Sequence, residues 1–138
     1  MVKGNNHINL IIVLLFSLFF VSGCDKQFAK ETGFLEGKIS IGPLCPVEHD
    51  PPDPWCLPTA KTYKAYPVII WTSNGRRKIT QLSPSLDGSY NLELNPGNYL
   101  VILEIGQSKI GNSNLPTEVE IISQNKTILD IDIDTGIR

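Results

Sequence analysis

Three cysteines are the residues of this chain with the most distinctive chemistry. Cys24 directly follows an apolar run at residues 8–21, INLIIVLLFSLFFV. Cys45 and Cys56 enclose the segment CPVEHDPPDPWC. A thiol can carry a lipid, form a disulfide or bind a metal, and an odd number of cysteines leaves at least one without a disulfide partner in its own chain. The position of Cys24 sets it apart from the other two.

The apolar run before Cys24 has the length of the hydrophobic region of a signal peptide. A stable membrane-spanning helix usually needs about 20 apolar residues, which is more than this run provides. The small residues Ser22 and Gly23 separate the run from the cysteine. Small side chains at these positions let an extended backbone enter a protease cleft. These features are typical of a signal peptide.

The sequence VSGC at 21–24 resembles the lipobox of bacterial lipoproteins, in which a peptidase cleaves before a cysteine that carries a diacylglycerol. The resemblance implies a signal peptide at 1–23 and a tether at 24–33 with lipid, including acyl chains such as palmitate, on Cys24. Each buried acyl carbon contributes about 0.8 kcal/mol to membrane attachment. We expect a protein anchored in the cell membrane that faces the periplasm or the cell exterior. A plain secretory signal and an uncleaved membrane-spanning anchor are the alternatives.

If Cys24 carries lipid, Cys45 and Cys56 remain as a pair, and we expect them to form a disulfide in an oxidising compartment. The chain-entropy account values such a closure at about 3 kcal/mol. Two free thiols or half of a metal site are the alternatives. Zinc is poorly served, because His49 is the one histidine after residue 23 and no CxxC spacing occurs. We therefore expect no cofactor.

The segment between these two cysteines is the strongest candidate for a binding site. Six prolines stiffen it and its flanks, at positions 43, 46, 51, 52, 54 and 58. A rigid loop loses little entropy on binding, and an aromatic side chain supplies contact area. The candidate binding residues are Trp55, His49, Tyr63 and Tyr66. In the alternative, the loop only covers one open end of the domain and Trp55 folds onto the core.

The run DIDID near the end of the chain places Asp130, Asp132 and Asp134 on one face of an expected strand. Three carboxylates make a weak calcium candidate, because their spacing departs from the calcium loop of EF-hands. We favour the alternative of a solvated face that discourages edge-to-edge pairing of strands.

Charge and residue inventory exclude two further classes of function. The chain has 12 Lys and Arg against 14 Asp and Glu, a formal net charge of −2 at pH 7. This balance offers no basic footprint for nucleic acid, and no known nucleic-acid motif occurs, so we expect no nucleic-acid partner. A serine triad would have to use His49, whose neighbours offer only Glu48 or Asp50 to orient it. We therefore expect no enzymatic activity.

The elements that must position these residues are short strands, because apolar positions alternate and Gly, Pro and Asn interrupt them. Leu35, Ile39 and Ile41 fall on one face of the first strand. Asn74-Gly75 predicts a type I′ hairpin turn, 106–116 predicts a polar loop, and nothing predicts a helix of three turns. The expected strands are 34–41, 65–73, 76–82, the stretch between Asp87-Gly88 and Asn95, 99–105, 117–123 and 126–134.

About seven such strands indicate an all-β fold, an antiparallel Greek-key β-sandwich. The segments LEGKISIGPLCPV, YPVIIW and LDGSYNLELNPGNYLVIL together resemble the carboxypeptidase regulatory-like domain, a transthyretin-like or prealbumin-like β-sandwich. The resemblance covers roughly residues 34–105 and is most specific at 87–90 and 96–99. It implies that 34–138 forms one such domain. Tyr99 follows a turn and is expected to return its hydroxyl to the backbone as a corner tyrosine.

Members of this group are usually non-catalytic modules, so the resemblance implies a binding or structural role. The zinc peptidase associated with the family needs two histidines and a glutamate for its metal, and only one histidine follows residue 23. The related hydrolases that open hydroxyisourate end in Tyr-Arg-Gly-Ser, whereas this chain ends in DTGIR. We expect a membrane-anchored, non-enzymatic module that binds an envelope protein or glycan. The alternatives are a peptidase inhibitor that presents the loop between Cys45 and Cys56, and a carbohydrate- or calcium-dependent adhesin.

Overall fold

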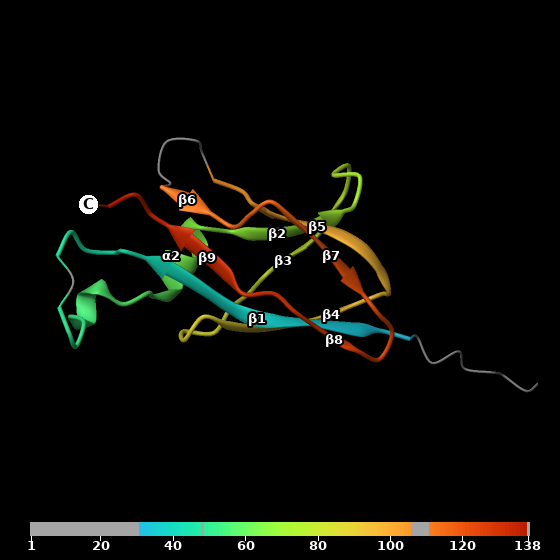
Figure 1. Cartoon of the computed structure of the whole chain (residues 1–138), viewed down its shortest axis with the longest axis horizontal. Coiled ribbons are helices and arrows are strands. Elements are labelled where there is room, and N and C mark those ends of the chain that lie inside the picture. The colour runs from blue at the N-terminus through green and yellow to red at the C-terminus, as the bar shows by residue number, and fades with distance from the viewer. Residues whose placement is uncertain (1–30, 48, 106–110, 138) are drawn as a thin grey trace, which may run out of the picture.

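The computed structural model describes residues 31–47, 49–105 and 111–137. The predicted signal peptide, the predicted lipid attachment at Cys24 and half of the polar loop expected at 106–116 lie outside these residues. Within the described part, the chain forms nine strands, one short α-helix and one 3₁₀-helix (Figure 1).

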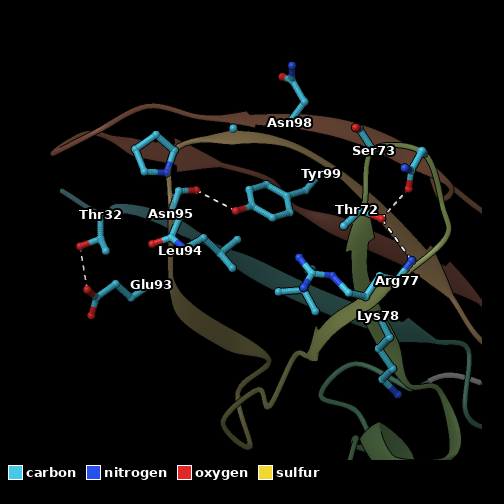
Figure 2. A pocket seen from close by; sticks show the side chains of 14 residues that line it. Thr32, Thr72, Ser73, Arg77, Lys78, Glu93, Leu94, Asn95, Asn98 and Tyr99 are labelled. Atoms are coloured by element: carbon cyan, nitrogen blue, oxygen red, sulfur yellow. Dashed lines mark hydrogen bonds between the residues drawn. The ribbon is translucent and has the colours of Figure 1, made fainter. Parts of the chain in front are cut away.

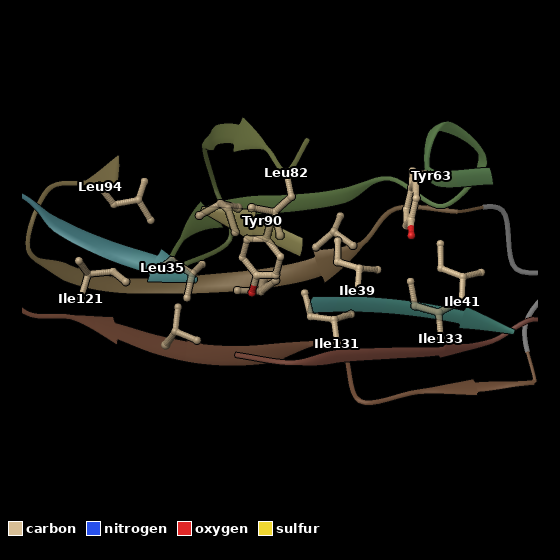
Figure 3. Close-up of a cluster of buried hydrophobic side chains, with 14 residues drawn as sticks. Leu35, Ile39, Ile41, Tyr63, Leu82, Tyr90, Leu94, Ile121, Ile131 and Ile133 are labelled. Atoms are coloured by element: carbon tan, nitrogen blue, oxygen red, sulfur yellow. The ribbon is translucent and has the colours of Figure 1, made fainter. Parts of the chain in front are cut away.

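Two β-sheets pack against each other and enclose an apolar core between them (Figure 3). The first sheet has the order β4 (Ser89–Leu94), β1 (Gly33–Gly42), β9 (Ile131–Asp134) and β6 (Asn112–Ser113), and β8 (Lys126–Ile128) also pairs with β1. The second sheet has the order β3 (Lys78–Gln81), β2 (Val68–Thr72), β5 (Gly97–Leu103) and β7 (Thr117–Ile121). The predicted β-sandwich is confirmed, with more strands than expected, several of them shorter than predicted.

Strand β1 illustrates how the sequence pattern builds the core. Leu35, Ile39 and Ile41 are buried. Lys38 and Ser40, the residues on either side of Ile39, are exposed. Side chains alternate between the two faces of a strand, so an apolar residue at every second position places one face of β1 in the core. Each such side chain contributes roughly 1.5–3 kcal/mol when it is fully buried. The expected inward face of 34–41 is therefore confirmed.

The expectation of a fully antiparallel sandwich is wrong at the centre of the first sheet. Strand β1 is antiparallel to β4 but parallel to both β8 and β9. The single strand expected at 126–134 is divided, because the backbone leaves the ladder at Leu129. There the N–H of Leu129 donates to the carbonyl oxygen of Glu36, and Gly37 of β1 packs against the Leu129 carbonyl group.

The type I′ turn expected at Asn74-Gly75 is also wrong. That turn needs a positive φ at both central residues, and only Gly75 has one, at 66°. The loop is longer than a two-residue hairpin and is organised by side chains. The Asn74 Oδ1 atom accepts the N–H of Arg76 at 3.0 Å, and the Thr72 hydroxyl accepts the N–H of Arg77 at 3.1 Å.

A short helix, α2 (Ala60–Ala65), precedes β2 and was not expected from the sequence. Thr59 caps its first turn, because its side chain accepts the N–H of Thr62 and its own N–H donates to the Thr62 hydroxyl. The helix occupies the start of the segment expected as a strand at 65–73. Strand β2 therefore begins only at Val68, directly after Pro67.

Candidate functional site

The segment that follows β1 is closed by a disulfide between Cys45 and Cys56, with Cα atoms 5.5 Å apart. We call residues 45–56 the disulfide loop. The 3₁₀-helix η2 (Pro54–Cys56) forms its last turn. Figure 1 shows this loop beyond the end of β1, at the opposite end of the sandwich from the point where the chain enters β1. The predicted pairing of the second and third cysteines is present in the structure.

Trp55 projects from this loop into solvent, with 77% of its surface exposed. The alternative in which Trp55 folds onto the core is therefore wrong. Val47 in the same loop and Leu57 just after it are also exposed, at 65% and 46%. A large exposed aromatic side chain on a covalently closed, proline-rich loop is the kind of anchor that protein interfaces bury at their centre.

His49 lies in the same loop and is held locally. Its Nδ1 atom lies 2.9 Å from Oδ2 of Asp53, four residues further along the sequence, and the histidine is exposed. The sequence suggested Glu48 or Asp50 as orienting partners for His49, and the structure supplies Asp53 instead. Glu48 itself lies outside the described residues. This pair is a local contact within the disulfide loop.

The other two predicted binding residues do not belong to the exposed surface of the loop. Tyr63 lies in α2 and is 8% exposed, and its hydroxyl donates to the carbonyl oxygen of Leu86 at 3.4 Å. Burial, with a smaller effect from the charge of Asp87, raises the pKa of Tyr63. Tyr66 is half-buried and packs against the core. The structure thus separates the four predicted residues into two exposed and two packed ones.

An apolar groove of about 370 Å³ lies between α2 and the segment 81–86. Tyr63 and Leu82 contribute to its wall, and Leu86 at its margin is 71% exposed. The sequence did not indicate this groove, because it depends on the unexpected helix.

A larger and more polar groove, of about 940 Å³, lies at the other end of the sandwich. We call it the tether-end groove, because Thr32 of the predicted tether lines it (Figure 2). Its remaining lining comes from the β2–β3 loop and from the turn between β4 and β5. Since three separate chain segments form it, no contiguous motif in the sequence could have indicated it.

The polar groups of the tether-end groove are held by hydrogen bonds within its walls (Figure 2). The Thr32 hydroxyl donates to Oε1 of Glu93 at 2.7 Å. The Tyr99 hydroxyl donates to the carbonyl oxygen of Asn95 at 2.8 Å, which confirms the predicted corner tyrosine. Gly97 in the same turn has a positive φ of 147°, a conformation that L side chains rarely adopt.

Two of the three aspartates of the DIDID run accept hydrogen bonds from backbone N–H groups. Oδ1 of Asp130 accepts the N–H of Lys38 at 2.9 Å, and Oδ1 of Asp134 accepts the N–H of Gly136 at 2.8 Å. Asp132 is exposed on β9. Among the described residues, no group of three or more His, Cys, Asp or Glu side chains is arranged to hold a metal ion. This part of the chain therefore provides no set of ligands for the calcium ion considered above.

The described part of the chain contains no helix with the length and apolar character needed to cross a bilayer. Its fold and exposed loop define a class, a small all-β sandwich domain with a disulfide loop at one end.

The sequence matches no family model and no curated protein. Among solved structures, it is similar to the minor pilin GBS52 of Streptococcus agalactiae, with 18% identity and a TM-score of 0.51 over 76% of this chain and 45% of that chain. A DUF3823 family protein from Parabacteroides merdae also matches, with 14% identity and a TM-score of 0.46 over 76% of this chain and 47% of that chain. The chain therefore spans less than half the length of these proteins, and the first likeness shows a shared β-sandwich fold.

Proposed function

We propose that this protein is a lipid-anchored, extracytoplasmic binding module that presents its disulfide loop to a protein partner at the cell envelope. The observation that carries this proposal is Trp55, which is 77% exposed on a loop closed by a disulfide. An exposed tryptophan lowers the solubility of a monomeric protein. A partner that covers this side chain removes its apolar surface from water, which favours binding.

The geometry of β1 supports presentation away from a membrane. The strand has ten residues, so its length is about 30 Å at about 3.3 Å per residue. The chain enters β1 from the predicted tether at 24–33 and leaves it toward the disulfide loop. A lipid on Cys24 would hold one end of the sandwich near the bilayer, and β1 would then place Trp55 at the far end.

The remaining parts of the proposal come from the sequence. The lipobox-like VSGC at 21–24 supports a signal peptide at 1–23, lipidation of Cys24 and localisation outside the cytoplasm. The disulfide supports an oxidising compartment. The domain at 34–138 would be a carboxypeptidase regulatory-like, transthyretin-like module with Greek-key connections and without enzymatic activity.

Peptidase inhibition is the second candidate, and the closed loop favours it. A loop held by a disulfide, by several prolines and by the contact between His49 and Asp53 resists the extension that proteolysis requires. Incubation with a panel of envelope proteases separates the two candidates. An inhibitor blocks one of them and stays uncut between Cys45 and Cys56, whereas a binding module leaves all of them active.

The test of the binding function is capture of a partner from envelope extract with the full chain and two variants. Trp55→Ala removes the exposed anchor, and Ile128→Ala is the matched control, because Ile128 is 65% exposed on β8, outside the disulfide loop. Both substitutions should change the free energy of unfolding by no more than about 0.5 kcal/mol, as is usual for exposed positions. We expect the native chain and Ile128→Ala to capture the same protein and Trp55→Ala to lose it. Equal capture by all three would refute a role for the loop.

A further inference from the structure

The tether-end groove is a second concave surface, far from the disulfide loop and independent of the function proposed for that loop. We propose that this groove binds a glycan chain that carries a carboxylate. The proposal rests on the polar groups that line the groove, on Arg77, with which no carboxylate of the described residues forms an ion pair, and on the hydrogen bonds that hold its walls.

The side chains that line the groove can both donate and accept hydrogen bonds. Asn95 and Asn98 are exposed, and each amide can donate and accept; the Ser73 hydroxyl can do the same. Sugar hydroxyls also donate and accept, so a chain of sugar rings can satisfy such a surface along its whole length. A protein partner would instead need apolar anchors, and this groove is mainly polar, with Leu94 buried at its floor.

The positive charge of Arg77 favours a glycan that carries a carboxylate. Figure 2 shows its side chain reaching from the β2–β3 loop toward Asn95 and Leu94. Within the described part of the chain no carboxylate forms an ion pair with Arg77, whereas the neighbouring Lys78 lies 4.0 Å from Glu104. A guanidinium group binds a carboxylate or a phosphate through two parallel hydrogen bonds, so Arg77 favours an acidic group on the ligand.

Glu93 distinguishes the glycan from a simple anion. Its Oε1 atom already accepts the Thr32 hydroxyl, and its carboxylate is exposed at the groove. A negative side chain here repels an anionic group placed beside it, whether phosphate or carboxylate, but it accepts hydrogen bonds from sugar hydroxyls. A compact anion cannot hold its charge away from Glu93, whereas a glycan chain can turn hydroxyls toward Glu93 and a carboxylate toward Arg77. Glu93 and Arg77 lie on different sides of Leu94 in Figure 2, so they would orient the hydroxyl-bearing and acidic parts of one ligand.

Both walls of the groove are rigid before any ligand binds. In the β2–β3 loop, the Thr72 hydroxyl lies 2.7 Å from Oδ1 of Asn74, and the N–H of Gly75 donates to the Thr72 carbonyl oxygen at 2.7 Å. In the opposite turn, the hydrogen bond from Tyr99 to Asn95 fixes the aromatic ring beside the groove. Walls held in this way lose little conformational entropy when a ligand binds.

The experiment is a titration of the full chain in detergent micelles with tetragalacturonate, a tetrasaccharide with a carboxylate on every ring. Its neutral methyl ester is the matched ligand, and phosphatidylglycerol vesicles test for an anionic lipid headgroup. Calorimetry measures affinity, and NMR shifts of backbone amides locate the site. Arg77→Ala is the test variant and Arg76→Ala its matched control, because Arg76 is the adjacent arginine and does not line the groove.

We expect tetragalacturonate to bind, with shifts confined to residues 32, 72–79 and 93–99, and its methyl ester to bind more weakly. Arg77→Ala should reduce the affinity about tenfold or more, the usual effect of losing a charge-assisted hydrogen bond. Arg76→Ala and Trp55→Ala should leave it unchanged, so this proposal and the one for the disulfide loop can fail separately. Asn98→Ala, at an exposed position, is a second variant with an expected reduction.

Three results would overturn the inference. The first is absence of tetragalacturonate binding to the folded chain. The second is equal affinity of the Arg76→Ala and Arg77→Ala variants, which would show that only general charge matters. The third is binding to phosphatidylglycerol vesicles without any response to tetragalacturonate, which would assign the groove to a lipid phosphate.

Discussion

Removing a single hydroxyl group, in the variant Tyr90→Phe, should destabilise the fold measurably. Tyr90 is 6% exposed, and its hydroxyl donates to the carbonyl oxygen of Leu129 at 2.6 Å. Leu129 lies where β8 ends and β9 has not yet begun, so this hydrogen bond reaches across β1 and ties the interruption between β8 and β9 to β4. Phenylalanine would leave the carbonyl group of Leu129 without this donor.

The expected loss is about 1–2 kcal/mol of unfolding free energy, the usual cost of leaving one buried polar group unsatisfied. For a domain of this size, the loss corresponds to a decrease in Tm of roughly 5–10 °C. Calorimetric unfolding at pH 7 measures it. The matched control is Tyr99→Phe, which removes the same atom from an exposed hydrogen bond that water can replace. If both variants unfold at the same temperature, the contact between Tyr90 and Leu129 does not stabilise the fold as argued.

The same pair predicts a pH dependence. Burial, with a smaller contribution from the charge of Asp130, raises the pKa of Tyr90 above its ordinary value of about 10. The stability associated with the protonated hydroxyl is fully present below pH 10, the range in which tyrosine in the unfolded chain is also protonated. It is lost as pH rises toward the higher pKa of the folded state, at up to roughly 1.4 kcal/mol per pH unit. The difference between the native chain and Tyr90→Phe should therefore shrink between pH 10 and 11, and a constant difference would contradict the reasoning.

Two further substitutions test other parts of the fold. Gly37→Ala should cost about 2–3 kcal/mol through overpacking, because a Cβ atom there would collide with the Leu129 carbonyl group, whereas Gly42→Ala in the same strand has nothing within 4 Å and serves as the control in urea unfolding. The double variant Cys45→Ser and Cys56→Ser should lose about 3 kcal/mol, because the disulfide closes a loop with a sequence separation of 11. An unchanged urea midpoint in that double variant would show that the closure does not constrain the unfolded chain.

Local patterns in the sequence predicted what depends on neighbouring residues. The alternation of Leu35, Ile39 and Ile41 predicted the inward face of β1, since side-chain direction in a strand follows from position alone. The cysteine count predicted the disulfide. The turn before Tyr99 predicted the return of its hydroxyl to the backbone.

Features that depend on distant segments could not be predicted in the same way. Alternation is identical in parallel and antiparallel strands, so the parallel pairing of β1 with β8 and β9 leaves no local signal. Helix α2 has six residues, too few to show a helical period clearly. The tether-end groove joins Thr32 to two loops far along the chain, and Arg77 taken alone indicates only a solvated basic residue.

The position of β1 has a mechanical consequence. If a lipid holds the chain before Gly33 and a partner holds the disulfide loop after Gly42, tension between membrane and partner runs through β1 itself. An extended strand is already close to the maximum length of its backbone, so it transmits a pull without lengthening. The covalent backbone of β1 would carry the tension, while hydrogen bonds to β4 on one side and to β8 and β9 on the other keep the strand extended and in place. The rest of the sandwich would stay outside the path of the force, so the module could keep its fold while it holds a partner under strain.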